Sequence, residues 1–463
     1  YSMKKYFLAV ASFFIYSHIS LGQVYPGQMD STFVPVRSHH YDPELTFDFC
    51  VNEPAWNNQA GIHSAFGSTD RLYFRKEVPV NHNNDLSSSY STTVWRGERA
   101  NAQILVWSSE ALEQVRVSTQ DLRSAEGNII PKDRITFELV RYVLSNYPYA
   151  EKKAICGESP YKSGFLMPDR FETLDRFDLP SQTTRPVWMM VDVPRGTVPG
   201  TYKGQVEVRA KGKAPQLLNL EIVVQNQLLP YPKDWKYRLD LWQNPWAVAW
   251  YNHVEPWSPE HKMLLKQHLK HYADAGGTYI TTYGVHSPWS DNSYMIEGGM
   301  IEWIKKADGT WAFDYKIFDE YVELAMECGI DEAITLYTPI PWGFRHRYKD
   351  EATGDYSYIN WAPSSEEFKK MWNIFLTDFK FHLEAKSWLD ITYIGINENP
   401  MEETLAAINV VRNHDKCWKI TYAGNWHKEL DGLLDDYSFL YGEEPTIAEQ
   451  KARAATGRTS TVY

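Results

Sequence analysis

The hydrophobic pattern of this chain changes at Leu229-Pro230-Tyr231-Pro232. Before that point, apolar and polar residues alternate with the period of two that strands require, as in Gln103–Trp107 and Leu218–Val224. Beyond it, short apolar runs alternate with amphipathic helices, the order that builds a parallel sheet or barrel. The sequence therefore predicts a multidomain β plus α/β protein, with a β-sandwich at residues 23–232 and a (β/α)8 TIM-type barrel at residues 233–463.

Helix signals support the α/β interpretation of the second part. Ser258 and Pro259 suit the N-cap and first position of one helix, and a second helix is expected at about Tyr315–Glu327. Ser364 and Glu367 have the spacing of a capping box ahead of a third helix.

Seven short apolar runs are candidates for the strands of the barrel. They are Arg238–Trp242, Thr278–Tyr283, Glu332–Tyr337, Asp390–Ile396, Lys419–Tyr422, Tyr437–Tyr441 and Thr459–Tyr463. Because a (β/α)8 barrel has eight strands, we expect the barrel to be incomplete in this chain, with its C-terminal part missing.

The first residues have the features of an export signal. Met3-Lys4-Lys5 is basic, and the apolar run Tyr6–Tyr16 is too short to span a bilayer. We therefore predict a signal peptide at residues 1–22 and a secreted or periplasmic protein. No later run reaches the roughly 18 apolar residues of a membrane helix, so stable membrane insertion is not expected.

Charge and cysteine spacing exclude several function classes. A formal net charge of −12, without a cluster of Lys and Arg among aromatics, argues against a nucleic-acid partner. Cys50, Cys156, Cys328 and Cys417 are scattered and form neither a zinc nor a redox motif. We expect no metal and no cofactor.

The chain is rich in aromatic residues, with 18 Trp, 30 Tyr and 20 Phe. Ring faces stack on the apolar faces of sugars, which favours a carbohydrate site. Large β-rich and barrel folds also use many aromatic residues in their cores, so composition alone leaves both interpretations open.

The fourth candidate strand runs directly into Asn397-Glu398-Asn399-Pro400. In a (β/α)8 barrel the active site forms at the C-terminal ends of the strands, and a carboxylic acid there can protonate a glycosidic oxygen. Glu398 is therefore the candidate general acid. The alternative is that Glu398 only stabilises the N-terminus of the helix that begins near Met401.

Groups suited to binding a sugar follow the other candidate strands. Rings can form stacking walls, while Asn, His and Asp side chains hydrogen-bond hydroxyl groups. The candidate substrate-binding residues are Asp240, Trp242, Tyr283, His286, Tyr337, Trp342, Tyr422, Asn425, Trp426 and His427. His286 and His427 lack a third ligand at metal spacing, and Glu443-Glu444 either supplies a second carboxylate or forms a solvated loop.

Five motifs together resemble those of glycoside hydrolase family 123. They are Asp240-Leu241-Trp242-Gln243-Asn244-Pro245, Trp257-Ser258-x-Glu260-His261, Ala273-Asp274-Ala275-Gly276, Ile340-Pro341-Trp342 and Pro400-Met401-Glu402. The resemblance covers most of the chain after the signal peptide. It implies a β-sandwich ahead of a (β/α)8 barrel and an exo-acting N-acetyl-β-galactosaminidase of glycolipids and related glycans.

The resemblance also implies substrate-assisted catalysis with retention of configuration. The acetamido oxygen of the substrate attacks the anomeric carbon, Glu398 matches the family's general acid/base, and the preceding residue orients the acetamido group. This chain has Asn397 where the family has Asp, and Asn399 where an Arg is usual. A neutral amide cannot offset the positive charge of an oxazolinium, which typically costs a few kcal/mol of transition-state stabilisation.

Two alternatives follow from that difference. In one, Glu398 is the acid/base of a retaining β-glycosidase with a separate Glu nucleophile, about 5 Å from the Glu398 carboxylate. In the other, the protein binds glycans without cleaving them.

Overall fold

The computed structural model describes residues 53–81, 86–145, 165–289 and 298–463. The predicted signal peptide at residues 1–22 lies outside them, so export remains a prediction. The chain divides between Leu229 and Pro230 into two compact units, each with its own hydrophobic core. In the part that the structure describes, no helix combines the length and the apolar character needed to cross a membrane.

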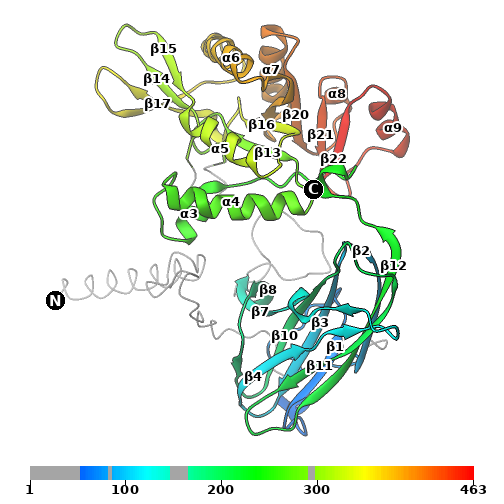
Figure 1. Cartoon of the computed structure of the whole chain (residues 1–463). Helices are drawn as coiled ribbons and strands as arrows, with labels where there is room; N and C mark the ends of the chain where they lie inside the picture. The colour runs from blue at the N-terminus through cyan, green and yellow to red at the C-terminus, as the bar shows by residue number, and fades with distance from the viewer. Residues whose placement is uncertain (1–52, 82–85, 146–164, 290–297) are drawn as a thin grey trace, which may run out of the picture. The chain divides into compact units, whose positions relative to one another are not determined.

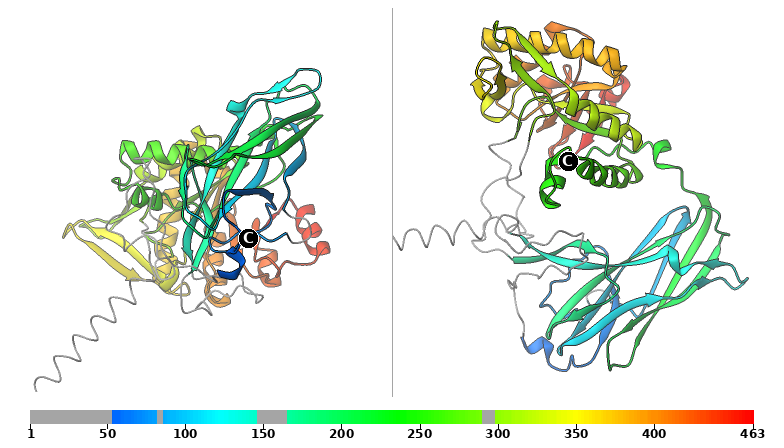
Figure 2. Two further views of the ribbon diagram at one scale, coloured as in Figure 1. Left: turned by 90° about the horizontal axis from the view of Figure 1, so that it is seen from below. Right: turned by 60° about the vertical axis from the view of Figure 1, so that its left-hand side comes forward.

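The first unit is β-rich, as predicted, and consists of two sheets (Figures 1 and 2). One sheet has the order β1 (His63–Gly67), β3 (Arg99–Ser108), β10 (Thr183–Asp192), β7 (Ile135–Ser145), β8 (Phe165–Glu172). The other has the order β2 (Ser89–Arg96), β12 (Gln216–Leu228), β11 (Gly200–Arg209), β4 (Leu112–Thr119), β9 (Phe177–Leu179); in addition, β5 (Leu122–Arg123) pairs with β11, and β6 (Ile129–Ile130) pairs with β5.

Both sheets contribute to one core. Ile104 and Met189 from the first sheet, and Val206 and Ile222 from the second, are fully buried in it. Most ladders are antiparallel, but β2 and β12 run parallel, with Ser89 opposite Asn219.

The second unit is an α/β domain around a curled parallel sheet. The strands are β13 (Tyr279–Tyr283), β16 (Ala333–Tyr337), β19 (Thr392–Ile396), β20 (Lys419–Gly424), β21 (Asp436–Phe439) and β22 (Thr459–Val462), adjacent in chain order. The helices are α3 (Pro245–Tyr251), α4 (Pro259–Asp274), α5 (Lys316–Glu327), α6 (Glu366–Lys386), α7 (Met401–His414), α8 (Lys428–Asp431) and α9 (Ile447–Ala455). A closed eight-stranded barrel is not present among the described residues.

A second sheet accompanies the parallel one and was not predicted. Its order is β15 (Trp311–Asp314), β14 (Glu302–Lys305), β17 (Arg345–Asp350), β18 (Tyr356–Asn360). Short helical turns complete the described structure: η2 (Glu53–Trp56), η3 (Lys132–Arg134), η4 (Pro232–Asp234), η5 (Trp342–Phe344) and η6 (Leu389–Ile391).

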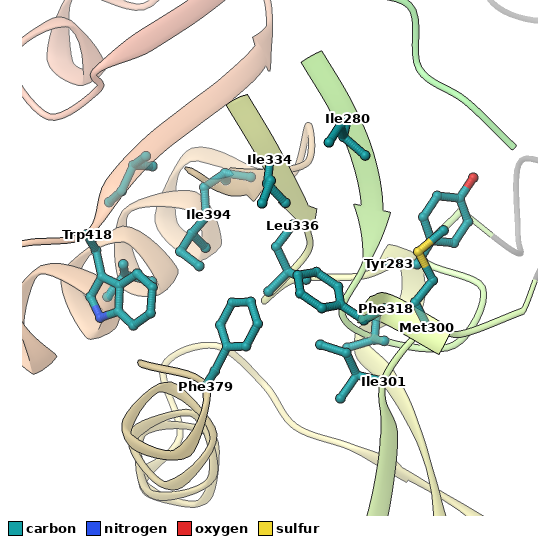
Figure 3. Packing of buried hydrophobic residues seen from close by; sticks show 14 of the residues in the cluster. Ile280, Tyr283, Met300, Ile301, Phe318, Ile334, Leu336, Phe379, Ile394 and Trp418 are labelled. Atoms are coloured by element: carbon teal, nitrogen blue, oxygen red, sulfur yellow. The ribbon is translucent and has the colours of Figure 1, made fainter. Parts of the chain in front are cut away.

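Apolar side chains between the strands and the helices form the core of the second unit (Figure 3). Ile334 and Ile394 project from neighbouring strands toward Phe318 on α5 and Phe379 on α6, and all four are fully buried. This packing fixes the strands, so the residues that follow each strand are held at one edge of the sheet.

The predicted strand at Arg238–Trp242 is wrong as a full strand. Leu239 forms only an isolated parallel bridge with Gly277. The reason is that a side chain takes the backbone groups of this segment: the Tyr272 hydroxyl lies 2.7 Å from the Leu239 carbonyl oxygen and 3.3 Å from the Leu241 amide nitrogen. These bonds replace part of a strand ladder.

The helix starts follow capping chemistry. Ser258 accepts a hydrogen bond from the His261 amide at the start of α4, as predicted. The predicted capping box at Ser364 and Glu367 is wrong by one residue, because Ser365 is the N-cap of α6 and accepts from the Phe368 amide.

Candidate functional site

The candidate site lies where the parallel strands end. Their register places Tyr283, Tyr337 and Gly395 level with one another on β13, β16 and β19. A Cβ added at Gly395 would lie 3.0 Å from the Tyr337 ring, so Gly395 makes room for that ring. Because side chains alternate along a strand, Asn397 shares the face of Gly395 and Tyr337, whereas Ile394 and Ile396 face the core.

Aromatic rings line this face at the strand ends. Trp289 lies 5.2 Å from Tyr283 and 5.0 Å from Tyr337, measured between ring centroids. Trp242 lies 6.2 Å from Tyr337 and 5.3 Å from Tyr463. We call Trp242, Tyr283, Trp289, Tyr337 and Tyr463 the ring cluster; burial raises the pKa of the Tyr337 hydroxyl well above its ordinary value, so this hydroxyl stays protonated.

Asn397 is bound to the ring cluster. Its Oδ1 accepts a hydrogen bond of 3.1 Å from the Trp289 indole, and the residue is only 4% exposed. Its Nδ2 is buried and has no hydrogen-bond partner among the described residues.

Glu398 is exposed and lies beside the end of β20. Its Oε1 accepts a hydrogen bond of 3.3 Å from the Asn425 amide. Burial raises the pKa of Tyr437 to about 12, and the Glu398 charge contributes to the rise. The pKa of Tyr422 is also raised, first by burial and then by the charges of Tyr437 and Glu398.

Asp240 has an unusual ionisation state. Burial, followed by the charge of Asp436, raises the pKa of Asp240 to about 7, and a hydrogen bond with Trp242 acts in the opposite direction. The Oδ1 atom is buried without a partner among the described residues, although the residue as a whole is half-buried. Asp240 also lines a cleft of about 670 Å³, together with Trp242, Ser438 and Tyr463.

Two further predicted residues, His286 and Trp342, lie near the ring cluster. Burial and then the charges of Arg347 and Arg345 lower the pKa of His286 to about 4. The Trp342 amide donates to the Pro288 carbonyl oxygen, next to Trp289. No cluster of three or more His, Cys, Asp or Glu residues suited to a metal occurs in the described ranges.

Three predicted residues form the turn after β20. The Tyr437 hydroxyl donates to the Asn425 carbonyl oxygen at 2.6 Å and accepts from the His427 amide at 2.9 Å. The Trp426 ring packs 5.3 Å from Tyr437, so these three residues surround a core tyrosine of β21.

The structure thus brings together Asp240, Trp242, Tyr283, Tyr337 and Asn397 in one group, and Glu398, Tyr422, Asn425, Trp426 and His427 in another. The adjacent residues Asn397 and Glu398 join the two groups. Sequence analysis missed Trp289 and Tyr463. Trp289 lies in the segment after β13, three residues beyond the predicted His286, which was the available signal.

The comparisons with known proteins agree with this architecture. The glycoside hydrolase 123 catalytic domain matches residues 242–463, and the glycoside hydrolase 123 N-terminal domain matches residues 66–210. The chain therefore belongs to glycoside hydrolase family 123, as its motifs predicted, which makes it a glycosidase by class.

One solved structure is similar over most of the chain. It is a family 123 glycoside hydrolase from Clostridium perfringens, described in terms of glycolipid glycan hydrolysis, with 24% identity, a TM-score of 0.76, and coverage of 87% of this chain and 72% of that one. This similarity shows a shared fold. A second match is a PapD-like domain of human CEP192, with 12% identity, a TM-score of 0.20, and coverage of 41% of this chain and 99% of that one. No curated protein matches the chain.

Proposed function

We propose that this protein releases terminal β-linked N-acetylgalactosamine from glycans or glycolipids, with Glu398 as general acid/base. The observation that supports this most is the position of Glu398, an exposed carboxylate at the C-terminal edge of a parallel sheet, next in sequence to Asn397, which is hydrogen-bonded to the ring cluster. We also propose that the curled sheet is part of a (β/α)8 barrel, where this edge is the catalytic one.

The proposed reaction has two steps. The acetamido oxygen attacks the anomeric carbon, the bond to the leaving oxygen breaks, and Glu398 donates a proton to that oxygen. Water then attacks the anomeric carbon of the oxazolinium, Glu398 takes the proton of the water, and the acetamido group is restored. Two inversions give net retention of configuration.

The ring cluster suits the sugar that this reaction needs. Aromatic faces of Trp242 and Trp289 offer stacking surfaces, and the Tyr337 hydroxyl is a neutral donor. The glycosidic oxygen of the bound sugar has to lie at Glu398. The acetamido group of the same sugar then lies close by, at the adjacent residue Asn397.

The neutral amide of Asn397 favours one second candidate, a protein that binds the same sugar without efficient hydrolysis. Without a carboxylate at this position, the positive charge of the oxazolinium has no counter-charge from residue 397.

An assay with 4-nitrophenyl N-acetyl-β-galactosaminide tests the proposal, with 4-nitrophenyl β-galactoside as the control lacking the acetamido group. We expect release of nitrophenol from the first substrate only, β-configured initial product by NMR, and inhibition by the thiazoline analogue of N-acetylgalactosamine. Equal hydrolysis of both substrates would contradict substrate assistance, and thiazoline binding without hydrolysis would favour the binding protein.

A further inference from the structure

The contact between Trp289 and Asn397 determines which way round the Asn397 amide lies. An indole N–H can only donate a hydrogen bond, so the atom 3.1 Å from Trp289 Nε1 has to be the amide oxygen. The NH2 group of Asn397 therefore points away from the indole nitrogen. This orientation follows from chemistry and not from the labelling of two similar atoms.

The NH2 group has no acceptor within the described protein. Asn397 is 4% exposed, its Nδ2 is buried without a partner among the described residues, and the residue follows β19 on the face of the sheet that carries Gly395 of β19 and the Tyr337 ring of β16. Buried N–H groups without an acceptor are rare in folded proteins, and more so than carbonyl oxygens with a vacant lone pair. A ligand that fills this site is therefore stabilised if it brings an acceptor oxygen to Nδ2.

We infer that Asn397 donates a hydrogen bond to the carbonyl oxygen of the 2-acetamido group of the bound sugar. Trp289 is then the positioning residue that enforces this direction of donation, which we call the polarity of the hydrogen bond. The inference rests on the proposed function for the identity of the sugar. It reverses the role that the family pattern assigns to this position, where a carboxylate accepts a hydrogen bond from the acetamido N–H.

The polarity has a chemical consequence. The carbonyl oxygen is the nucleophile of the first step, and a hydrogen bond donated to it withdraws electron density from it. The same bond leaves the acetamido N–H without an acceptor at residue 397, so the positive charge that develops on nitrogen is not stabilised there. Asn397 therefore favours binding of the intact sugar over its conversion.

An aspartate at position 397 has nearly the same shape as the asparagine, but its carboxylate can only accept hydrogen bonds. The polarity of the hydrogen bond to the acetamido group is therefore reversed. One carboxylate oxygen accepts the Trp289 N–H, and the other accepts the acetamido N–H. Asn397→Asp should then raise kcat by roughly 100-fold or more, the typical effect of one preorganised electrostatic partner in a transition state.

The test compares binding of free N-acetylgalactosamine with that of its thioacetamido analogue, by titration calorimetry, since neither sugar is hydrolysed. Sulfur is a poorer acceptor than oxygen, whereas the thioamide N–H is a better donor. For the chain with Asn397 we expect the analogue to bind about 5- to 10-fold more weakly, the contribution of one hydrogen bond. For Asn397→Asp we expect no loss or a gain, and the larger size of sulfur affects both proteins alike.

Trp289→Phe tests the positioning role, because the released amide can turn its oxygen toward the acetamido N–H. In the protein that keeps Asn397, Trp289→Phe should bring the ratio of the affinities for the oxygen and sulfur sugars toward one. In the Asn397→Asp background, Trp289→Phe should leave this ratio unchanged. Trp418→Phe is the matched control, since that indole also donates to a side chain, that of His414, and lies just before β20, at the end of the strand away from the site. A structural role for Trp289 would lower affinity for both sugars and leave their ratio unchanged.

The outcomes separate this inference from the proposed function. If both sugars bind but the oxygen-to-sulfur ratio is the same with Asn397 and with Asp, the inferred polarity is wrong and the function stands. If neither sugar binds to any variant, the proposed function is wrong and the inference falls with it. If Trp289→Phe proves unstable by thermal melting, the comparison of Asn397 with Asp alone decides the polarity.

Discussion

Gly424 and Glu398 are in such close contact that a side chain at position 424 would have to displace the side chains beside it, that of Glu398 among them. A Cβ added at Gly424 would lie 2.7 Å from Glu398 Cγ and 2.8 Å from Oε1, and 2.5 Å from the Tyr422 hydroxyl. The end of β20 therefore lies directly against the proposed acid/base, which follows β19.

Replacing this glycine should displace Glu398. We expect Gly424→Ala to lower kcat at least 10-fold, because small displacements of a catalytic group are costly, while far-ultraviolet circular dichroism stays unchanged. Gly200→Ala is the matched control: the φ angles are +156° at Gly424 and +157° at Gly200, but a Cβ at Gly200 meets nothing within 4 Å. Equal activity of the two variants would show that crowding at Glu398 does not matter.

Glu398→Gln should remove proton transfer and retain the fold. General acid catalysis contributes about 10²- to 10⁴-fold, so we expect a loss of that size on a substrate with an alkyl leaving group. The loss should be much smaller with dinitrophenol, which leaves without a proton. Glu402→Gln, an exposed carboxylate in the first turn of α7, is the control and should keep its activity on both. Full activity of Glu398→Gln on the alkyl substrate would exclude the assigned role.

Asp240 should make the stability of the protein depend on pH. Its pKa is raised from 3.8 to about 7, mainly by burial, so between these values the folded protein binds the proton more tightly than the unfolded chain does. Stability is thus lost as pH rises through this window, and the full penalty is present above pH 7.

Asp240→Asn should remove that penalty. We expect the variant to be more stable than the parent by on the order of 1–3 kcal/mol at pH 8 and by little at pH 4, measured by urea unfolding at both pH values. Asp234→Asn, at an exposed position nearby, should show no such pH dependence. A pH-independent difference for Asp240→Asn would mean that the carboxyl is not protonated in the fold.

The sequence predicted the repeating order of strands and helices because hydrophobic periodicity is local. Strands were expected and found at Thr278–Tyr283 and Glu332–Tyr337, where the structure has Tyr279–Tyr283 and Ala333–Tyr337. The segment at Arg238–Trp242 has strand-like residues, but Tyr272 binds its backbone, and no local pattern reveals a contact of that kind.

The site was predicted less completely for the same reason. Asn397 and Glu398 follow a strong strand pattern, whereas the partner of Asn397 is Trp289, 108 residues away in the sequence. The raised pKa of Asp240 likewise depends first on its burial and then on the charge of Asp436, and both come from the fold. Neither relationship is visible until the strands are packed.

The two units differ in how early their strands can pair while the chain is being made on the ribosome. In the parallel sheet of the second unit, each strand lies next to the strand of that sheet made before it, so every newly emerged strand of the sheet finds its neighbour in place. In the first unit β2 cannot pair until β12 has been synthesised, because 130 residues separate Ser89 from Asn219. During synthesis β2 is thus an unpaired edge that can pair with another nascent chain. Slow or interrupted translation before β12 is therefore expected to cause aggregation through the first unit.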